Sequence, residues 1–338
     1  MATPLDELER LGDLLAQPAP SKRMLIIVNP YATTVSDRLK NLVVYALRGR
    51  YQVDAVETQS RDHATALSRE AAHEGYDIVV AFGGDGTVNE AAHGLAGSRT
   101  PLGVLPGGAT NVYCRVLGVP NEIVDATEHL LRLAGDWHPR PVDLGLVNDR
   151  HFLFSAGLGL DASVVERVDA HPYRKAKFGE WYFTWAALDI FNRRYLLSPP
   201  QIEVRWDGEE VRGVTVIVQN AHPYTYFNKR PIEIGEGAEL DSGTLAGAVL
   251  RRASPIDMPT VIWRALSKRA RIVNHRQVTG FDGVEWLECR SSDDRPIPLQ
   301  VDGDYIGDIP EATFGIAAGA LLVVAKSIAR RSWLGTQG

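Results

Sequence analysis

The sequence has few of the features that mark a secreted or membrane-spanning protein. It contains two cysteines in 338 residues, Cys114 and Cys289, which fit neither a disulfide framework nor a zinc-binding spacing. It has no uninterrupted run of about 18 apolar residues, which a transmembrane helix requires. The N-terminus lacks the basic start and the apolar stretch of a secretory signal. We therefore expect a cytoplasmic protein whose contact with a membrane, at its inner face, is peripheral.

An excess of positive charge is also absent. The chain has 36 Lys and Arg against 42 Asp and Glu, for a net charge of -6. Nucleic-acid binders usually show the opposite balance, so we expect no nucleic-acid partner. The nine histidines show no metal-ligand spacing and are interpreted as structural or surface groups. With 45% hydrophobic and 23% charged residues, the chain is predicted to be globular, and its length suits two domains.

Apolar strands and helices alternate through residues 22–140. The expected strands are 24–28, 51–56, 78–82 and 102–105, and the expected helices are 37–48, 63–74 and about 88–95. Strands that are apolar throughout and separated by helices indicate a parallel sheet covered on both faces. We predict a doubly wound α/β nucleotide-binding domain, whose ligands gather at the carboxyl ends of the strands.

The pattern changes in residues 141–325. Short alternating strands are separated by three expected Asp-Gly turns, at Asp207, Asp282 and Asp302, with one helical insertion near 178–194. This pattern predicts a mostly antiparallel β-sandwich domain. Its last strand, near 320–325, is a candidate to pack back on the first domain. Residues 1–21 are expected to be a mobile tail, with a short amphipathic helix at 5–15, and residues 326–338 a basic tail.

A glycine-rich loop directly follows the strand that ends at Phe82. It reads Gly83, Gly84, Asp85, Gly86, Thr87, Val88, Asn89 and Glu90. Glycines let the backbone approach a phosphate closely, and the helix that follows presents its positive end to the same place. Asp85 is a candidate to hold a magnesium ion that bridges phosphate oxygens. The alternative is a tight turn with Asp85 as the helix N-cap.

Two further segments are predicted to lie at the same sheet edge. Residues 106–111 form a second glycine-rich loop after the next strand, and Thr58 follows the strand at 51–56. Because loops after neighbouring parallel strands lie side by side, two such loops make a floor for a nucleotide. Taken alone, Thr58 is an ordinary loop hydroxyl.

These motifs resemble those of the diacylglycerol kinase catalytic domain, a family that includes bacterial soluble lipid kinases, sphingosine kinases and ceramide kinases. The resemblance spans roughly residues 22–325 and is strongest at 78–115, where both glycine loops lie. Asn29 and Pro30 fit the family's opening signature. Residues 152–162 resemble its Phe-x4-Gly-x-Gly-x-Asp-Ala stretch, and residues 301–304 its Asp-Gly-Glu stretch.

The resemblance implies an ATP-dependent, magnesium-assisted kinase that transfers the γ-phosphate to a hydroxyl of a lipid, either diacylglycerol or a related lipid. Its implied base is a carboxylate of the pair Asp302 and Asp304, with Asp85 as the third catalytic acid and the residue that meets the magnesium of ATP. The implied nucleotide contacts are Asn29, Thr58, Gly83, Gly84, Asp85, Gly86, Thr87, Asn89, Glu90, Gly108 and Asn111. Which of Asp302 and Asp304 faces the substrate stays open, and a plain Asp-Gly-Asp hairpin turn is the alternative.

Several residues depart from the family pattern. Ala109 offers no hydroxyl to a phosphate, Val112 replaces an acidic residue, and Ser242 replaces an aspartate that helps to bind a structural magnesium in the family. We favour a working kinase, because Asp85, Asn89 and the acidic pair remain. The alternatives are an enzyme similar to NAD kinase, which also uses Gly-Gly-Asp-Gly, and a non-catalytic member that binds nucleotide or lipid.

Two segments are candidates for contact with a lipid surface. Residues 178–185 are rich in aromatic side chains, which suit a membrane interface or, as the favoured alternative, packing against the β sandwich. Residues 264–276 carry several basic residues and no acid, which suits anionic headgroups or a solvated helix face. The expected partners are therefore a lipid substrate and a peripheral anionic membrane surface, with a homodimer left open.

Overall fold

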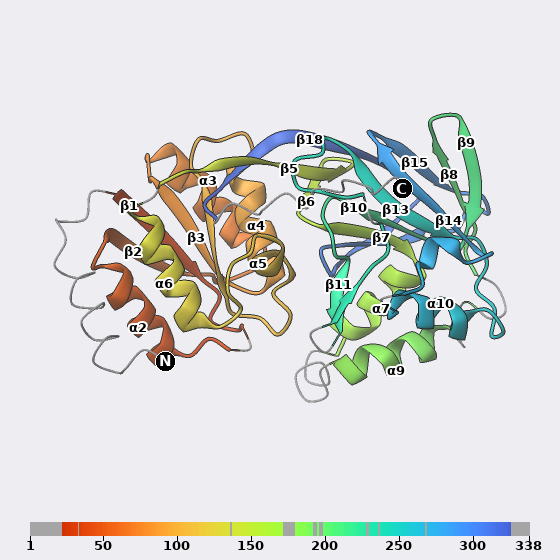
Figure 1. The fold of residues 1–338 in the computed structure, drawn as a ribbon, viewed down its shortest axis with the longest axis horizontal. Helices are drawn as coiled ribbons and strands as arrows, with labels where there is room; N and C mark the ends of the chain where they lie inside the picture. Colours follow the sequence, from red (N-terminus) through yellow and green to blue (C-terminus); the bar gives the residue numbers. More distant parts are fainter. Residues whose placement is uncertain are drawn as a thin grey trace, which may run out of the picture.

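The computed structural model describes residues 22–325, apart from residues 33, 136, 172–179, 192–194, 196–198, 228–229, 236 and 268. Both expected tails, including the expected helix at 5–15, lie outside the described residues. The first half of the chain forms four parallel strands in the order β2-β1-β3-β4 (Figure 1). Their bounds are β1 Lys22–Val28, β2 Tyr51–Glu57, β3 Ile78–Gly83 and β4 Leu102–Pro106.

Helices cover both faces of this parallel sheet (Figure 1). They are α2 Asp37–Leu47, α3 His63–His73, α4 Asp85–Leu95, α5 Val112–Val116 and α6 Ile123–Leu133. The hydroxyl of Ser36 accepts a hydrogen bond from the N–H of Leu39 and so caps the start of α2. Helix α2 packs against α6, and α3 packs against α4. Because β1, β3 and β4 are apolar and almost wholly buried, they form the centre of the first hydrophobic core.

The second half of the chain is built around a six-stranded sheet in the order β14-β13-β10-β7-β16-β17, in which every pair is antiparallel. These strands are β7 Ser155–Gly159, β10 Thr215–Gln219, β13 Leu245–Leu250, β14 Val278–Val284, β16 Ile297–Val301 and β17 Asp304–Ile309. Helices α7 Leu160–Asp169, α9 Glu180–Ile190 and α10 Met258–Ala265 lie together on one side of it, with the hairpin of β11 Thr225–Phe227 and β12 Arg230–Ile232 nearby (Figure 1).

One long strand connects the two halves. Strand β18, Glu311–Val323, pairs along most of its length with β5 Arg140–Val147. Its end pairs in parallel with β4, where the N–H of Val324 donates to the carbonyl of Leu102 at 3.0 Å. The remaining strands of this sheet are β6 Arg150–Phe152, β8 Ile202–Trp206, β9 Glu209–Gly213 and β15 Leu287–Ser291. The two halves therefore share a continuous ten-stranded sheet.

The three expected Asp-Gly turns have different outcomes. Asp207 and Asp302, each with the glycine that follows, have positive φ and connect antiparallel strands, as a two-residue hairpin turn requires. The expected turn at Asp282 is wrong. Asp282 and Gly283 lie inside β14, where the pairing with β13 shifts its register and Gly283 takes a φ of +70°. The dipeptide is a β-bulge there, because a left-handed glycine also serves an extra residue in one strand.

The predicted fold class is confirmed. The chain has an N-terminal α/β part with a parallel sheet and a C-terminal part dominated by antiparallel strands. Helix α9 confirms the expected helical insertion. Among its described side chains, Tyr182, Ala186 and Ile190 are buried, whereas Trp185 is half exposed and stacks on Tyr182. The helices α7 and α10 have no counterpart among the helices expected from the sequence.

Candidate active site

Four loops meet at the carboxyl edge of the parallel sheet and are joined by backbone hydrogen bonds. The N–H of Asn29, after β1, donates to the carbonyl of Phe82 at 3.0 Å. The N–H of Thr58, after β2, donates to the carbonyl of Val28 at 2.9 Å. The N–H of Gly107 donates to the carbonyl of Gly83 at 2.8 Å. The structure therefore brings the segments after β1, β2, β3 and β4 together, as the doubly wound arrangement predicts.

The two glycine loops pack so closely that side chains cannot separate them. A Cβ atom on Gly107 would lie 2.9 Å from the Cα of Gly83, and one on Gly108 would lie 2.8 Å from the Cα of Gly84. Both distances are shorter than a real carbon-carbon contact, and the neighbouring atoms belong to the backbone. Glycine is required at these positions because the backbones approach each other directly. The result is a narrow surface of main-chain atoms at the start of α4.

Asp85 joins the first loop to the second. Its carboxylate accepts hydrogen bonds from the N–H groups of Val112 and Tyr113, both at 3.0 Å, at the start of α5. Asp85 is therefore a helix cap, but it caps α5 rather than its own helix α4, whose N-cap is Gly84. Burial raises the pKa of Asp85, the two N–H groups oppose this shift, and the nearby Asp304 carboxylate adds to it.

The polar residues of α4 bind neighbouring segments of the protein. Thr87 accepts a hydrogen bond from the Asn29 side-chain amide at 3.1 Å. Glu90 accepts one from the N–H of Ala64 at 3.1 Å, at the start of α3. These contacts hold the loop after β1 and the neighbouring helix α3 in place. Contact of Glu90 with a nucleotide stays a prediction, since its carboxylate already stabilises the α3 terminus.

Asn111 closes the second glycine loop. The side-chain oxygen of Asn111 accepts a hydrogen bond from the N–H of Gly108 at 2.8 Å. The side-chain NH2 of Asn111 donates one to the carbonyl of Gly108, also at 2.8 Å. The amide also donates to Asn121 at 2.9 Å. Asn111 is buried and has a φ of +49°, a left-handed conformation that asparagine tolerates better than most residues. It shapes the loop through these bonds, and its contact with a nucleotide remains predicted.

The two acids of the β16–β17 turn lie in different environments. Asp302 is buried, and its carboxylate accepts four hydrogen bonds. The donors and distances are Leu153 N–H at 2.7 Å, Phe154 N–H at 3.0 Å, Ser155 N–H at 3.0 Å and the Asn89 amide at 2.7 Å. Burial raises the pKa of Asp302 to about 7, and the four donors oppose that shift. Asp302 thus fixes the turn and joins it to α4 through Asn89.

Asp304 instead faces the first glycine loop. A Cβ atom on Gly86 would lie 2.6 Å from Oδ2 of Asp304, so the carboxylate fills the space that the glycine leaves open. A hydrogen bond also stabilises the turn that carries Asp304, because the N–H of Gly303 donates to the Gln300 side-chain oxygen at 2.9 Å. Of the two carboxylates, that of Asp304 lies against the loop at the start of α4, and which of them faces the substrate stays a prediction.

Whether magnesium suits this site follows from the charges around it. Two carboxylates, Asp85 and Asp304, lie beside the N-terminus of α4, close enough for the charge of Asp304 to disfavour the ionised form of Asp85. A phosphate chain would add more negative charge there, and a magnesium ion bound by one or two carboxylates and the phosphates would offset it. Each Asp85 oxygen already accepts one N–H, which leaves further lone pairs on both. The residues therefore fit a magnesium ion that arrives with phosphates. Among the described residues, no cluster of three or more His, Cys, Asp or Glu side chains is placed to hold a metal by itself.

The departures from the family pattern have clear structural settings. Ala109 is exposed at the tip of the second loop, beside the half-buried Thr110. The Val112 side chain is buried in the core, while its N–H still binds Asp85. Ser242 donates its hydroxyl to the carbonyls of Glu239 and Thr244, both at 3.0 Å, and so closes its turn without an acidic side chain. These positions leave the described glycine loops intact.

Two contacts at the site were not expected from the sequence. The Arg115 guanidinium, on α5, lies 4.4 Å from the ring of Tyr226 on β11, which joins the first half of the chain to the second. The charge of Arg115 also lowers the pKa of Asp85 to a small extent. In the second contact, His93 on α4 and His151 on β6 approach each other with their Nδ1 atoms 3.0 Å apart. Neither pair is recognisable in the sequence, because its members are far apart along the chain.

Burial lowers the pKa values of both His93 and His151. The charge of His93 lowers the pKa of His151 further. One ring nitrogen must accept at this contact, so at least one imidazole is neutral. Below about pH 6.5 both histidines bind protons in the unfolded chain. In the folded chain their lowered pKa values keep them neutral to a lower pH. Taken by themselves, the two histidines therefore lower the free energy of unfolding as the pH falls from 7.5 to 5.5, by at most about 1.4 kcal/mol per histidine and pH unit, whereas the raised pKa of Asp302 acts in the opposite direction.

Urea unfolding at both pH values tests this expectation. The double variant His93→Gln and His151→Gln should lose less stability on acidification than the native chain. His73→Gln, at an exposed histidine of α3, serves as the control and should keep the native pH dependence. An equal pH dependence in the double variant would show that this pair does not resist protonation.

Comparisons with known proteins agree with this geometry. Residues 23–147, which include both glycine loops, match the diacylglycerol kinase catalytic domain. A diacylglycerol kinase of Bacillus subtilis (strain 168) is 27% identical over 298 residues, covering 86% of this chain and 92% of that protein. A diacylglycerol kinase of Staphylococcus aureus (strain bovine RF122 / ET3-1) is 26% identical over 297 residues, covering 86% of this chain and 88% of that protein.

Solved structures give the same picture. A candidate diacylglycerol kinase from Bacillus anthracis str. Sterne superposes with a TM-score of 0.70 at 25% identity, covering 92% of this chain and 97% of that one. A further diacylglycerol kinase structure from the same organism has a TM-score of 0.65 at 22% identity, covering 90% and 97% of the two chains, and supports the fold alone. Within the part of the chain that the structure describes, no helix is long and apolar enough to cross a membrane.

The fold, the glycine loops and these matches define a phosphotransferase of the diacylglycerol kinase type, which confirms the enzyme class expected from the sequence. Residues 23–147 match the diacylglycerol kinase catalytic domain, which agrees with the resemblance seen in the sequence.

Proposed function

We propose that the protein transfers the γ-phosphate of ATP to a hydroxyl of diacylglycerol or a closely related lipid. The observation that carries this proposal is the position of Asp304, whose carboxylate lies against Gly86 at the start of α4. In this proposal Asp304 is the base, and its carboxylate lies beside main-chain N–H groups and a helix N-terminus, which suit phosphate. The names of the curated relatives supply the substrate class.

The proposed reaction uses the chain's own residues in separate roles. The loops at 83–87 and 106–111 bind the phosphates through backbone N–H groups, and Asp85 keeps the two loops in register. The lipid hydroxyl oxygen attacks the γ-phosphorus while the bond to the β-phosphate oxygen breaks, and ADP leaves. The hydroxyl proton passes to Asp304, which acts as the general base. Asp85 would hold a magnesium ion that arrives with ATP, and that ion would offset the charge of the phosphates.

A panel of acceptors tests the proposal. Purified protein is incubated with ATP labelled in its γ-phosphate and with diacylglycerol, a glycolipid, a long-chain base or NAD, each with and without magnesium. We expect label on diacylglycerol or a related lipid, and none on NAD. Label on NAD instead would place the protein with NAD kinases, and binding of ATP without any labelled product would indicate a non-catalytic member.

The close contact of the glycine loops gives a second expectation. In Gly108→Ala the new Cβ would press on the backbone at Gly84, which cannot move aside cheaply. Overpacking of this kind costs about 1–3 kcal/mol, so we expect ATP affinity to fall about 10-fold or more. Isothermal titration calorimetry measures this change. Gly135→Ala is the matched control, since its Cβ would meet only the carbonyl of Arg132 at 3.7 Å, and an equal loss there would contradict the loop-packing explanation.

A further inference from the structure

Apolar side chains are concentrated on the solvent side of α10. Of the eleven large hydrophobic residues that are exposed in the described chain, four lie between residues 256 and 266. They are Ile256 at 82%, Ile262 at 48%, Trp263 at 60% and Leu266 at 38% exposure. Isolated exposed hydrophobic residues are ordinary, but a contiguous group indicates a binding surface. We call these four residues, together with the exposed Arg251, Arg252 and Arg269, the α10 surface.

The opposite face of α10 explains why these residues cannot turn inward. Val261 is buried, and Met258 and Ala265 pack against the same apolar cluster, which also contains Ile190 of α9. Residues 258, 261 and 265 lie three and four apart and so share one side of the helix. Ile262 and Leu266 are four apart on another side, with Trp263 beside them. The helix is therefore fixed on the β domain with its second apolar side directed at solvent.

The charge around the α10 surface is opposite to that of the whole chain. Residues 250–271 contain six basic residues and one acid, Asp257, in a protein of net charge -6. That acid is already paired with Arg276, whose guanidinium lies 2.6 Å from its carboxylate. Arg251, Arg252 and Arg269 are exposed. Apolar side chains surrounded by arginines match the charge of an anionic lipid surface, since tryptophan suits the interface and arginine the headgroups.

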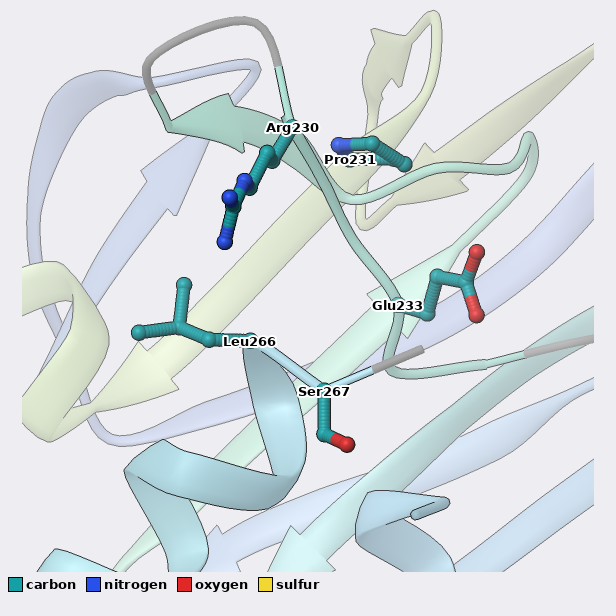
Figure 2. Close-up of a pocket in the computed structure, with 5 residues that line it drawn as sticks. All are labelled: Arg230, Pro231, Glu233, Leu266 and Ser267. Carbon is teal, nitrogen blue, oxygen red and sulfur yellow. The ribbon is translucent and has the colours of Figure 1, made fainter. Parts of the chain in front are cut away.

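A small pocket adjoins this surface. It has a volume of about 290 Å³ and is lined by Arg230, Pro231, Glu233, Leu266 and Ser267. Figure 2 shows Arg230 reaching from the β12 segment toward Leu266, which directly follows α10. None of these five residues is among the predicted nucleotide and catalytic residues. The pocket adds one arginine and one glutamate beside Leu266, so the excess of positive charge comes from the residues around α10.

We propose that the α10 surface docks the protein on an anionic membrane. Ile256, Ile262, Trp263 and Leu266 enter the boundary between headgroups and acyl chains, and the surrounding arginines contact the headgroups. The inference rests on the proposed lipid kinase activity for its purpose, since docking brings the enzyme to a substrate that resides in a bilayer. In Figure 1, α10 lies among the antiparallel strands, in the other half of the molecule from α4 and the parallel sheet.

Vesicle flotation with the full chain tests the proposal. Native protein should bind vesicles of phosphatidylcholine and phosphatidylglycerol, bind pure phosphatidylcholine less, and lose binding as salt is raised. Burial of two such side chains is favourable enough that Ile262→Ser with Trp263→Ala should lower the vesicle partition coefficient about 10-fold or more. Arg269→Glu should lower it about fivefold on anionic vesicles. Trp286→Ala, at an exposed tryptophan outside the α10 surface, should leave it unchanged.

Phosphorylation of diacylglycerol dispersed in detergent micelles separates docking from catalysis. The α10 variants should keep native turnover there, because docking on a bilayer is not required. If the native chain shows no turnover but the variants still lose vesicle binding, the proposed activity fails while docking stands. Native vesicle binding in the double variant would overturn the docking proposal. So would a native dimer that the variant disrupts without any change in vesicle binding, since a second copy of the chain would then cover the surface.

Discussion

Asp304→Asn is expected to lower kcat about 100- to 10,000-fold with little change in stability or ATP affinity. The substitution keeps the shape of the side chain but removes the carboxylate that we propose as the general base, and general-base catalysis contributes a factor of this size. The carboxylate lies beside Gly86, where the transferred phosphate is proposed to bind. Steady-state kinetics with diacylglycerol in detergent micelles measure kcat, and thermal unfolding measures the fold.

Asp308→Asn is the matched control for this experiment. Asp308 lies on the same strand β17, is exposed, and accepts a hydrogen bond from the Tyr305 hydroxyl that an asparagine oxygen would also accept. Its variant should retain native kcat. A kcat of Asp304→Asn within about threefold of the native value would show that another group removes the proton, because loss of a general base costs far more.

Asp302→Asn is expected to act on stability instead. The four donors around the Asp302 carboxylate all point at acceptor oxygens, and an amide supplies one oxygen and two competing donors. Buried donors without partners cost about 1–3 kcal/mol each, so we expect the free energy of unfolding to fall by about 3 kcal/mol. Urea unfolding measures this loss. Turnover should also fall, because the turn that carries Asp304 loses its attachment to β7 and α4.

The hairpin turn at Asp207 provides the comparison for Asp302. Asp207 has the same left-handed conformation and the same glycine neighbour, but it is exposed. Asp207→Asn should therefore change stability by less than about 0.5 kcal/mol, as at most surface sites. If the two variants were equally stable, the four hydrogen bonds would not be responsible for the position of the turn.

The sequence was sufficient for the strand-end loops but not for the roles of the individual acids. Buried strands and glycine spacing are local properties, so the parallel sheet and the approach of residues 83–87 to 106–111 could be predicted from them. The different environments of Asp302 and Asp304 depend on N–H groups of residues 153–155, about 150 positions away, which bind the Asp302 carboxylate. Sequence spacing carries no information about such partners.

The same limit applies to other motif residues. Glu90 reads as part of the nucleotide loop, yet its carboxylate caps the neighbouring helix α3. Asp85 reads as an N-cap of its own helix, yet it caps α5, and its role as a magnesium ligand stays a prediction. Asp282 and Gly283 read as a turn and form a bulge, because the pairing of β14 with β13 continues through them. A short motif is compatible with several local structures and hydrogen-bond partners, and tertiary contacts determine which of them forms.

Transfer of labelled phosphate from ATP to a lipid hydroxyl, measured side by side for the native chain and Asp304→Asn, tests the central claim most directly. The native chain should produce a phosphorylated lipid in a reaction that requires ATP and magnesium. Asp304→Asn, folded and still able to bind ATP, should produce almost none. A native chain that binds ATP but labels no lipid, or an Asp304→Asn variant with native turnover, would contradict the account.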